Sequence, residues 1–348
     1  MVQHKLPKTI LTATITGAVI LFGAPVLAQS NFYGDKSVTM LIGSGAGGGY
    51  DLYSRVLAKH MGRHIPGNPH IIPKNMPGAG SIKATNYLYN VAPKDGSIFA
   101  AVFNTLPVQP LVGRKGVRYD ATKLGWVGSI GKHQNICTTW HTNPINTFDK
   151  AKSTQVVVAA TGASGNAAIY PKLFNQMFGT KFKVVGGYKS SGALLAVTRG
   201  ETAGICGMSY QTLLASAPDW ILKKQVNILA QIGLKPHPAL KGVPMVLDMA
   251  KNKNDRDILT FLMIPQEMGR PYTAGPDLPR DRLATLRKAF DDTMKDPAFL
   301  RDANKARMKV EPITAAEMVS LVARLGAMPE KTIKNAAKLL VRKKKKKK

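Results

Sequence analysis

The glycine-rich stretch GSGAGGGYD, residues 43–51, combines residue types and spacing that suit anion binding. Glycine lets consecutive backbone N–H groups approach a ligand without obstruction by a side chain. An amphipathic segment follows from Asp51, and the N-terminus of a helix carries a partial positive charge. This stretch therefore predicts a site for a phosphate or a carboxylate. The alternative is a tight turn with no ligand.

A second stretch of the same kind, TGASGN, occupies residues 161–166. It offers backbone amides together with the hydroxyls of Thr161 and Ser164. Two such loops that face each other across a cleft would form a common kind of ligand site. A turn without a ligand is again the alternative.

Gly43, Gly45 and Gly48 also satisfy the spacing G-x-G-x-x-G of a dinucleotide-binding fold. That fold needs an acidic residue about 20 residues later to hold the ribose. No Asp or Glu occurs between Asp51 and Asp95. A nicotinamide-dependent oxidoreductase is therefore an alternative that the sequence disfavours, and no cofactor is expected.

Catalytic and metal-binding arrangements are weak in this sequence. Ser164 lies in GASGN, which lacks the last glycine of the nucleophile motif G-x-S-x-G. His60 and His64 are four residues apart, but no carboxylate or thiol is near them in the sequence. We interpret these histidines as exposed polar residues at the end of a helix. No enzyme activity and no metal are predicted.

The elements that must hold the two loops follow from the hydrophobic pattern. Short apolar runs alternate with helical periodicity, which indicates βαβ units and parallel sheets. The first loop joins a strand at 37–43 to a helix that ends at Gly62. Further strands are expected in 70–76, 95–104, 202–209 and 226–233, a further helix in 81–92, and strand–loop–helix units in 154–179 and 181–201.

Two more helices are expected near the C-terminus, over 279–296 and 314–328. Their apolar stripes indicate packing against a core. The stripes consist of Leu283, Leu286, Phe290 and Met294 in the first helix and Met318, Val319, Val322 and Leu325 in the second.

The first 28 residues are typical of a secretory signal peptide. Lys5 and Lys8 precede an apolar stretch, and small residues end at Ala28, after which cleavage is expected. A membrane anchor is the alternative, which Pro25 and the absence of a charged stop disfavour. No later apolar run approaches the roughly 20 residues that cross a bilayer.

The chain is strongly basic, with a formal charge of +29 over 348 residues. Two of these charges lie in the predicted signal peptide and seven in the tail at 342–348, so +20 remains on the body. The tail is interpreted as a solvated, disordered end. A basic body fits an anionic ligand, nucleic acid or an anionic membrane surface, and export disfavours nucleic acid as a partner.

Cys137 and Cys206 are the two cysteines of the chain. In an oxidising compartment a pair of cysteines is more often bonded than free, so a disulfide between them is expected. Two buried free thiols are the alternative.

Four stretches, in the order in which they occur, resemble a known family. They are GSGAGGGYDLYSRVLAKHM, IIPKNMPGAGSIKATNYLYNVAPKDGSIFA, VVGGYKSSGALLAVTRGETAG and DRLATLRKAFDDTMKDPAFL. NMPGAGS followed by APKDGS is much more specific than the first glycine loop. The sequence resembles the periplasmic receptors of tripartite tricarboxylate transporters, also called Bug or TctC receptors.

The resemblance implies an α/β fold of the type II periplasmic-binding-protein class. In this class two α/β domains close around a central ligand cleft, and hinge segments cross between them. Residues 32–132 together with 251–340 would form the first domain, and residues 133–250 the second. A chain of 348 residues is long enough for two domains.

The resemblance also implies that both loops bind a carboxylate through backbone amides, hydroxyls and bridging water. Asn104 and Thr105 match a position that faces the cleft. Two departures from the family are Gly43-Ser44, where a bulkier or proline-bearing start is usual, and Tyr50, which replaces a small hydroxyl residue. Tyr50 would narrow the site or stack on an aromatic acid. The expected ligand-binding residues are Ser44, Gly45, Ala46, Gly47, Gly48, Gly49, Tyr50, Asn104, Thr105, Thr161, Gly162, Ala163, Ser164 and Gly165.

The function that the resemblance implies is that of a monomeric, non-enzymatic receptor in the periplasm. It would capture an organic carboxylate, either a di- or tricarboxylate or an aromatic acid. It would then deliver this ligand to the permease subunits of a tripartite membrane transporter. A receptor that reports to a membrane sensor kinase is the alternative with the same fold, and the sequence does not separate the two.

Overall fold

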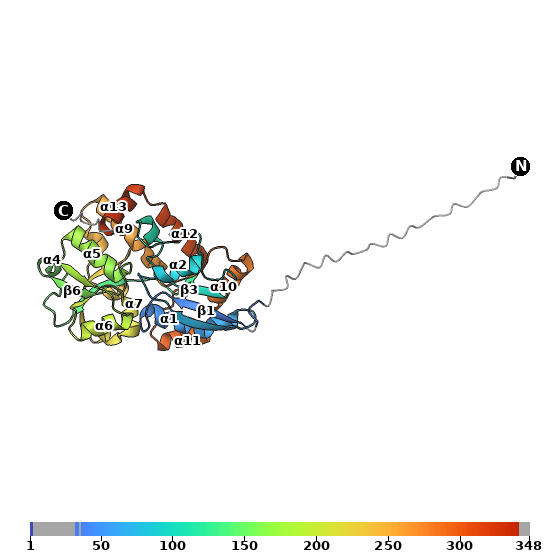
Figure 1. Ribbon diagram of the computed structural model, residues 1–348, viewed down its shortest axis with the longest axis horizontal. Helices are drawn as coiled ribbons and strands as arrows, with labels where there is room; N and C mark the ends of the chain where they lie inside the picture. The colour runs from blue at the N-terminus through green and yellow to red at the C-terminus, as the bar shows by residue number, and fades with distance from the viewer. Residues whose placement is uncertain (3–31, 35, 341–348) are drawn as a thin grey trace. The chain divides into compact units, whose positions relative to one another are not determined.

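The computed structural model describes residues 1–2, 32–34 and 36–340 (Figure 1). The predicted signal peptide, apart from its first two residues, and the predicted basic tail lie outside these residues. The chain from Phe32 onward clusters as one unit, and the description below concerns that unit alone. Among the described residues, no helix combines the length and the apolar composition that a bilayer span requires.

The first sheet takes its strands from two separate parts of the chain. These strands are β1 (Ser37–Ile42), β2 (His70–Asn75), β3 (Ile98–Ala101), β4 (Gly125–Ser129), β10 (Pro271–Ala274) and β11 (Ile313–Thr314), in the order β11-β4-β10-β3-β1-β2. β1 pairs in parallel with both β2 and β3, as the strand–helix–strand pattern predicts. β10 and β11 add antiparallel pairs, so the sheet is mixed rather than parallel throughout.

The second sheet lies within one continuous part of the chain. Its strands are β5 (Asn135–Trp140), β6 (Val156–Ala159), β7 (Phe182–Val185), β8 (Gly204–Ser209) and β9 (Val226–Ile232), in the order β7-β6-β8-β5-β9. β6 pairs in parallel with β7 and β8, whereas β5 runs antiparallel to β8 and β9. The chain therefore crosses from the first sheet to the second after β4, and returns before β10.

All the helices predicted from the sequence are present, with ends shifted by a few residues, and several others accompany them. The longer helices are α1 (Gly49–Met61), α2 (Ile82–Asn90), α5 (Asn166–Phe178), α6 (Ser190–Thr198), α9 (Lys253–Met268), α10 (Arg280–Thr293), α11 (Pro297–Lys305), α12 (Ala315–Gly326) and α13 (Glu330–Leu340). The shorter ones are α3 (Val108–Leu111), α4 (Lys150–Ser153), α7 (Tyr210–Ser216), α8 (Pro218–Leu222), η1 (Gly62–His64), η2 (Pro238–Leu240) and η3 (Val246–Met249).

Apolar faces of the helices pack against the sheets. Leu57 and Met61 of α1 are fully buried in the core of the first sheet, and each contributes about 1.5–3 kcal/mol. Leu325 of α12 and Ala336 of α13 belong to the core that contains β6 and α5, and Figure 1 shows α13 beside α9. Val319 is 47% exposed, so its assignment to the apolar stripe of α12 is wrong.

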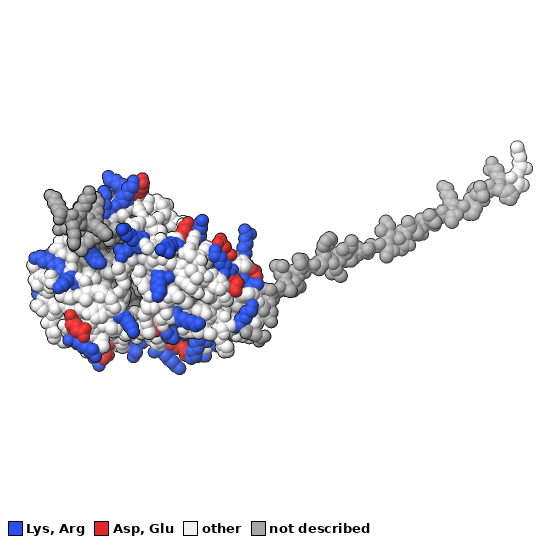
Figure 2. Space-filling view, viewed as in Figure 1, with Lys and Arg blue, Asp and Glu red and all other residues white. Residues whose placement is uncertain are grey.

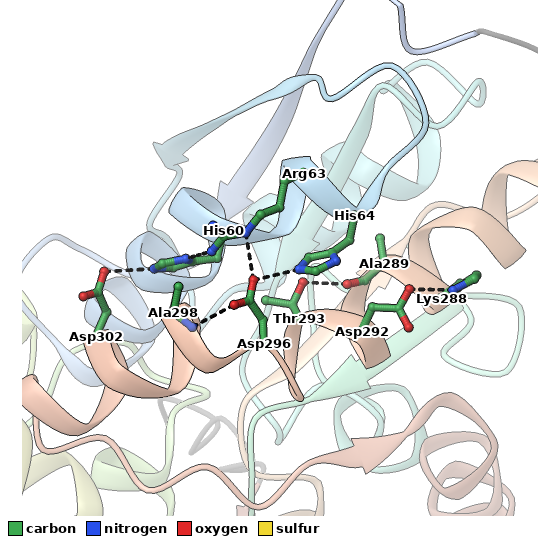
Figure 3. A network of polar contacts seen from close by, with 10 residues as sticks. All are labelled: His60, Arg63, His64, Lys288, Ala289, Asp292, Thr293, Asp296, Ala298 and Asp302. Carbon is green, nitrogen blue, oxygen red and sulfur yellow. Dashed lines mark hydrogen bonds and ion pairs between the residues drawn. The ribbon is translucent and has the colours of Figure 1, made fainter.

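The C-terminal end of α1 and the adjoining η1 are joined to α11 and to its N-cap residue Asp296 by ion pairs (Figure 3). His60 Nε2 lies 2.9 Å from Asp302 Oδ2. Arg63 Nε and His64 Nε2 lie 2.7 and 2.9 Å from Asp296 Oδ2. His60 is only 4% exposed, so its interpretation as an exposed polar residue is wrong. Its carboxylate partner comes from a part of the chain that is distant in sequence.

Cys137 of β5 and Cys206 of β8 form a disulfide, as the sequence predicts. The two residues are directly opposite each other in the antiparallel pair of strands, and both are buried. The bond therefore joins two neighbouring strands inside the second sheet. Among the described residues, no group of three or more His, Cys, Asp or Glu side chains is placed to hold a metal ion.

Candidate functional site

A cavity of about 90 Å³ lies where loops of the two sheets meet, and we call it the first cavity. The first sheet contributes the start of α1 and the residues after β3. The second sheet contributes the end of β8 and the starts of α5 and α6. His133, from the segment that crosses between β4 and β5, and Asn135, the first residue of β5, also line the first cavity.

Three helices begin at the first cavity. Its wall includes Gly49 of α1, Asn166 of α5 and Ser190 of α6. None of these helices has a side chain that accepts a hydrogen bond at its N-cap. The first N–H groups of a helix have no partner within the helix, and the helix dipole adds a partial positive charge there. The arrangement favours an anionic ligand.

A second cavity, of about 260 Å³, adjoins the first. Phe103, Thr161 and Ser190 line both cavities. The second cavity is bounded by Ser44, Gly45 and residues 77–80 from loops of the first sheet, and by residues 187–190 from the second. Lys189 brings a positive charge to its wall. The two cavities therefore form adjoining parts of one interface between the sheets.

Glycines of the first loop allow the two sheets to approach closely. A Cβ atom on Gly48 would collide with the side chain of Ser190, and one on Gly49 with that of Thr212. Because both partners belong to helices of the second sheet, these glycines are required by packing between the sheets as well as by any ligand.

Asp51 shapes the loop that precedes it. Its carboxylate accepts hydrogen bonds from Gly47 N–H at 2.9 Å, Asn75 Nδ2 at 2.8 Å and Arg55 Nε at 3.0 Å. Burial acts to raise the pKa of Asp51, but these hydrogen bonds outweigh it, and the pKa lies below its ordinary value. The carboxylate is thus ionised and engaged in holding the glycine loop.

Tyr50 connects the first cavity to the segment that returns to the first sheet. Its hydroxyl donates to Gly269 O and accepts from Asn104 N–H, each at 3.1 Å. The ring centroid lies 4.8 Å from that of Phe103 and 5.7 Å from that of His133. Burial raises the pKa of Tyr50, so the hydroxyl is neutral near pH 7. Tyr50 is therefore fixed in place by hydrogen bonds and by ring packing.

The structure brings most of the predicted ligand-binding residues to the two cavities. Thr105 and Ser164 line neither, but Thr105 Oγ1 donates to Ser164 O at 3.0 Å and so joins loops of the two sheets. Ala46 and Gly47 are exposed, and Ala163 lies at a separate pocket. The first cavity includes Gly48, Gly49, Tyr50, Asn104, Thr161 and Gly165, and the second includes Ser44, Gly45, Thr161 and Gly162.

Several residues at the site were not predicted from the sequence, and His133 and Arg270 are the two among them that are both buried and ionisable. His133 is 6% exposed, and neither of its ring nitrogens has a hydrogen-bond partner among the described residues. Burial, and then the charge of Arg270, lower its pKa well below the ordinary value, so the ring is neutral near pH 7. Arg270 itself is 2% exposed and donates to Thr212 on the cavity wall. Both residues lie in the crossing segments, where no motif marks them.

Two mixed α/β sheets, a chain that crosses between them and a cavity where their loops meet define the fold of the periplasmic binding proteins. Solved structures of such proteins match this chain over most of its length, so the predicted fold class is confirmed. The resemblance to the Bug and TctC receptors is confirmed as well, since BugD and a TctC solute-binding protein from Polaromonas are among the matching structures.

The matching structures are distant in sequence. The periplasmic binding protein BugD has a TM-score of 0.69 and 17% identity, over 88% of this chain and 97% of that one. MatC (Rpa3494) from Rhodopseudomonas palustris with bound malate has a TM-score of 0.68 and 16% identity, over 87% and 99%. Rpa4515 from R. palustris with adipate has a TM-score of 0.65 and 15% identity, over 86% and 97%. The TM-scores, over most of both chains, establish the shared fold.

A curated relative is similar in sequence as well. The UPF0065 protein in the gbd 5' region of Cupriavidus necator is 24% identical over 244 residues, which is 68% of this chain and 71% of the relative. No protein-family model matches the chain.

Proposed function

We propose that the protein is a periplasmic solute-binding receptor that captures an organic carboxylate and delivers it to the permease subunits of a tripartite membrane transporter. It binds this ligand without converting it. It reaches the periplasm through the signal peptide at residues 1–28 and acts as a monomer.

The observation that carries the proposal is the convergence of three helix N-termini, those of α1, α5 and α6, on the first cavity. Their N-caps bear no side-chain hydrogen bond, so their N–H groups are available to an anion. In partly buried geometry each such terminus stabilises a negative charge by up to about 2 kcal/mol. The structures of MatC with bound malate and of Rpa4515 with adipate support this ligand class.

We assign residues 32–132 and 251–340 to one lobe and residues 133–250 to the other, with α9 and α13 packing on the core of the second sheet. With this assignment the chain passes between the lobes at 132–133 and again at 250–251, between η3 and α9. Gly48 and Thr105 of the first lobe contact Ser190 and Ser164 of the second. A ligand held by both lobes favours the closed arrangement, because its contacts and these loop contacts form together.

The test is calorimetry of the purified mature protein against a panel of carboxylates that includes malate, adipate and benzoate. We expect at least one of them to bind, and to be recovered unchanged after incubation. Gly48→Ala is expected to abolish binding, because its Cβ atom meets Ser190. Gly192→Ala is the matched control, because its Cβ atom meets nothing within 4 Å. A folded protein that binds no carboxylate, or that converts one, would overturn the proposal.

A further inference from the structure

Arg270 is a buried cation that makes no ion pair with any described residue. It follows Gly269, where α9 ends, and its side chain is among the largest that are fully buried. Its Nη2 donates to Thr212 Oγ1 at 2.9 Å, and its guanidinium lies 3.7 Å from the centroid of the Tyr53 ring. Its Nε has no hydrogen-bond partner among the described residues.

The described residues supply neither an opposite charge nor a full set of hydrogen bonds to this buried guanidinium. A buried charge is unfavourable unless an opposite charge or a full set of hydrogen bonds accompanies it. Arginine cannot relieve the cost by losing its proton. The Tyr53 ring and a single hydroxyl compensate the guanidinium in part, and no carboxylate of the described chain neutralises it. An anion bound nearby would supply the missing negative charge.

Thr212 places this charge next to the first cavity. Its hydroxyl oxygen accepts from Arg270, so the hydroxyl hydrogen points elsewhere, and no described residue accepts it. Thr212 lines the first cavity, and it packs so closely on Gly49 that a Cβ atom there would collide with it. The polarised hydroxyl therefore lies beside the N-terminus of α1, at the position that favours an anion.

We propose that Arg270, acting through the Thr212 hydroxyl, is a positioning residue that makes the first cavity selective for a carboxylate over a neutral group of the same shape. This inference rests on the proposed function, and it identifies the residue that determines the specificity of the proposed binding site. The carboxylate accepts a hydrogen bond from the Thr212 hydroxyl, and its negative charge offsets the unpaired positive charge of the Arg270 guanidinium.

The experiment compares each carboxylate with its neutral amide by calorimetry. The probes are butyrate and butyramide, benzoate and benzamide, and adipate and adipamide. The measured quantity is the ratio of the dissociation constant of the amide to that of the carboxylate. A merely structural role of Arg270 would weaken both members of a pair equally and leave this ratio unchanged.

We expect the unmodified protein to favour a carboxylate by tenfold or more, and Arg270→Gln and Thr212→Val to reduce the ratio by roughly tenfold. Arg270→Lys retains the charge and should restore part of the ratio. Arg287→Gln is the matched control, because Arg287 donates to Trp126 O and lines neither cavity. If Arg270→Gln does not fold, Thr212→Val and Arg270→Lys still decide the question.

The outcomes separate the two proposals. An unchanged ratio in the variants that still bind the carboxylate would overturn the role of Arg270 and leave the receptor function standing. An amide bound as tightly as its carboxylate by the unmodified protein would also overturn that role. Absence of binding to every carboxylate would overturn the receptor function, and this inference with it.

Discussion

Gly80 and Gly162, from loops of different sheets, meet backbone to backbone. A Cβ atom on Gly162 would lie 2.5 Å from Gly80 N, closer than real Cβ atoms approach. The contact is possible because neither residue has a side chain. If the two sheets belong to lobes that close on a ligand, this pair of glycines sets how closely the lobes can meet.

Gly162→Ala should weaken ligand binding more than it weakens the fold. The added methyl group opposes the contact with Gly80 and costs roughly 1–3 kcal/mol in the closed arrangement. We expect a loss of affinity of about tenfold in calorimetry, with little change in the thermal midpoint. Gly186→Ala is the control, because a Cβ atom there meets nothing within 4 Å. Equal affinity in the two variants would argue against closure at this contact.

Loss of the disulfide should destabilise the protein without moving the cavity. The bond joins residues 69 positions apart, which predicts a contribution of about 4 kcal/mol in the chain-entropy model. Urea unfolding of the double variant Cys137→Ala/Cys206→Ala should show a decrease of that order. Thiol labelling of unreduced, denatured protein should find no free cysteine, and labelling of both cysteines would refute the bond.

Acid should weaken the junction between α1 and α11. The pKa values of Asp296 and Asp302 are lowered to about 2. Burial opposes the shift of Asp296, but hydrogen bonds from His64 and Ala298 N–H outweigh it, and a hydrogen bond from Lys59 is the main cause for Asp302. Because both values lie below the ordinary 3.8, the ionised pairs stabilise the fold above about pH 4. This stabilisation is lost as the pH falls toward 2.

The measurement is the free energy of unfolding in urea between pH 5 and pH 2, a range that runs from above the ordinary pKa of 3.8 down to the lowered value of about 2. Asp296→Asn should show a smaller decrease than the unmodified protein. Asp149→Asn, which removes an exposed ion pair with Lys152, should follow the unmodified protein. Parallel curves for all three proteins would exclude a role for Asp296 in acid stability.

Tyr50→Phe should destabilise the protein while the wall of the cavity is retained. The variant leaves Gly269 O and Asn104 N–H without their partner, which costs about 1–3 kcal/mol. The ring still packs on Phe103, so the order of preference among carboxylates should stay the same. Tyr50→Ala removes the ring and should admit bulkier acids. Urea unfolding and the carboxylate panel test both variants, and an altered preference in Tyr50→Phe would contradict this account.

Much of the fold follows from local patterns. The largely apolar runs of β1, β6 and β9 and the apolar stripe of α10 are strong signals, and all four elements are present. β4, with the sequence GWVGS, and the short β10, which begins with Pro271, carry little apolar periodicity. They add antiparallel strands that a βαβ pattern does not predict. α9 was missed because Pro265 interrupts its pattern, although tertiary packing keeps the helix continuous.

The residues of the candidate site could likewise be predicted from the sequence only in part. Glycine loops identify where backbone amides gather, and both loops reach the cavities. His133 and Arg270 could not be found, because their importance comes from burial and from partners far away in the sequence. Tyr50 illustrates the same limit. Its departure from the family pattern was visible, but its hydrogen bond to Gly269, 219 residues away, required the folded chain.

The bond between Cys137 and Cys206 also has a consequence for biogenesis, if the chain is exported as we propose. Cys137 emerges from the translocation channel first, and everything that forms β6, α5, β7 and α6 must follow before Cys206 arrives. Until then Cys137 has no partner within the chain and is open to mixed disulfides with thiol oxidases. Formation of this bond therefore requires the prior delivery of β5, β6 and β7, but not of β9, which follows Cys206 in the chain.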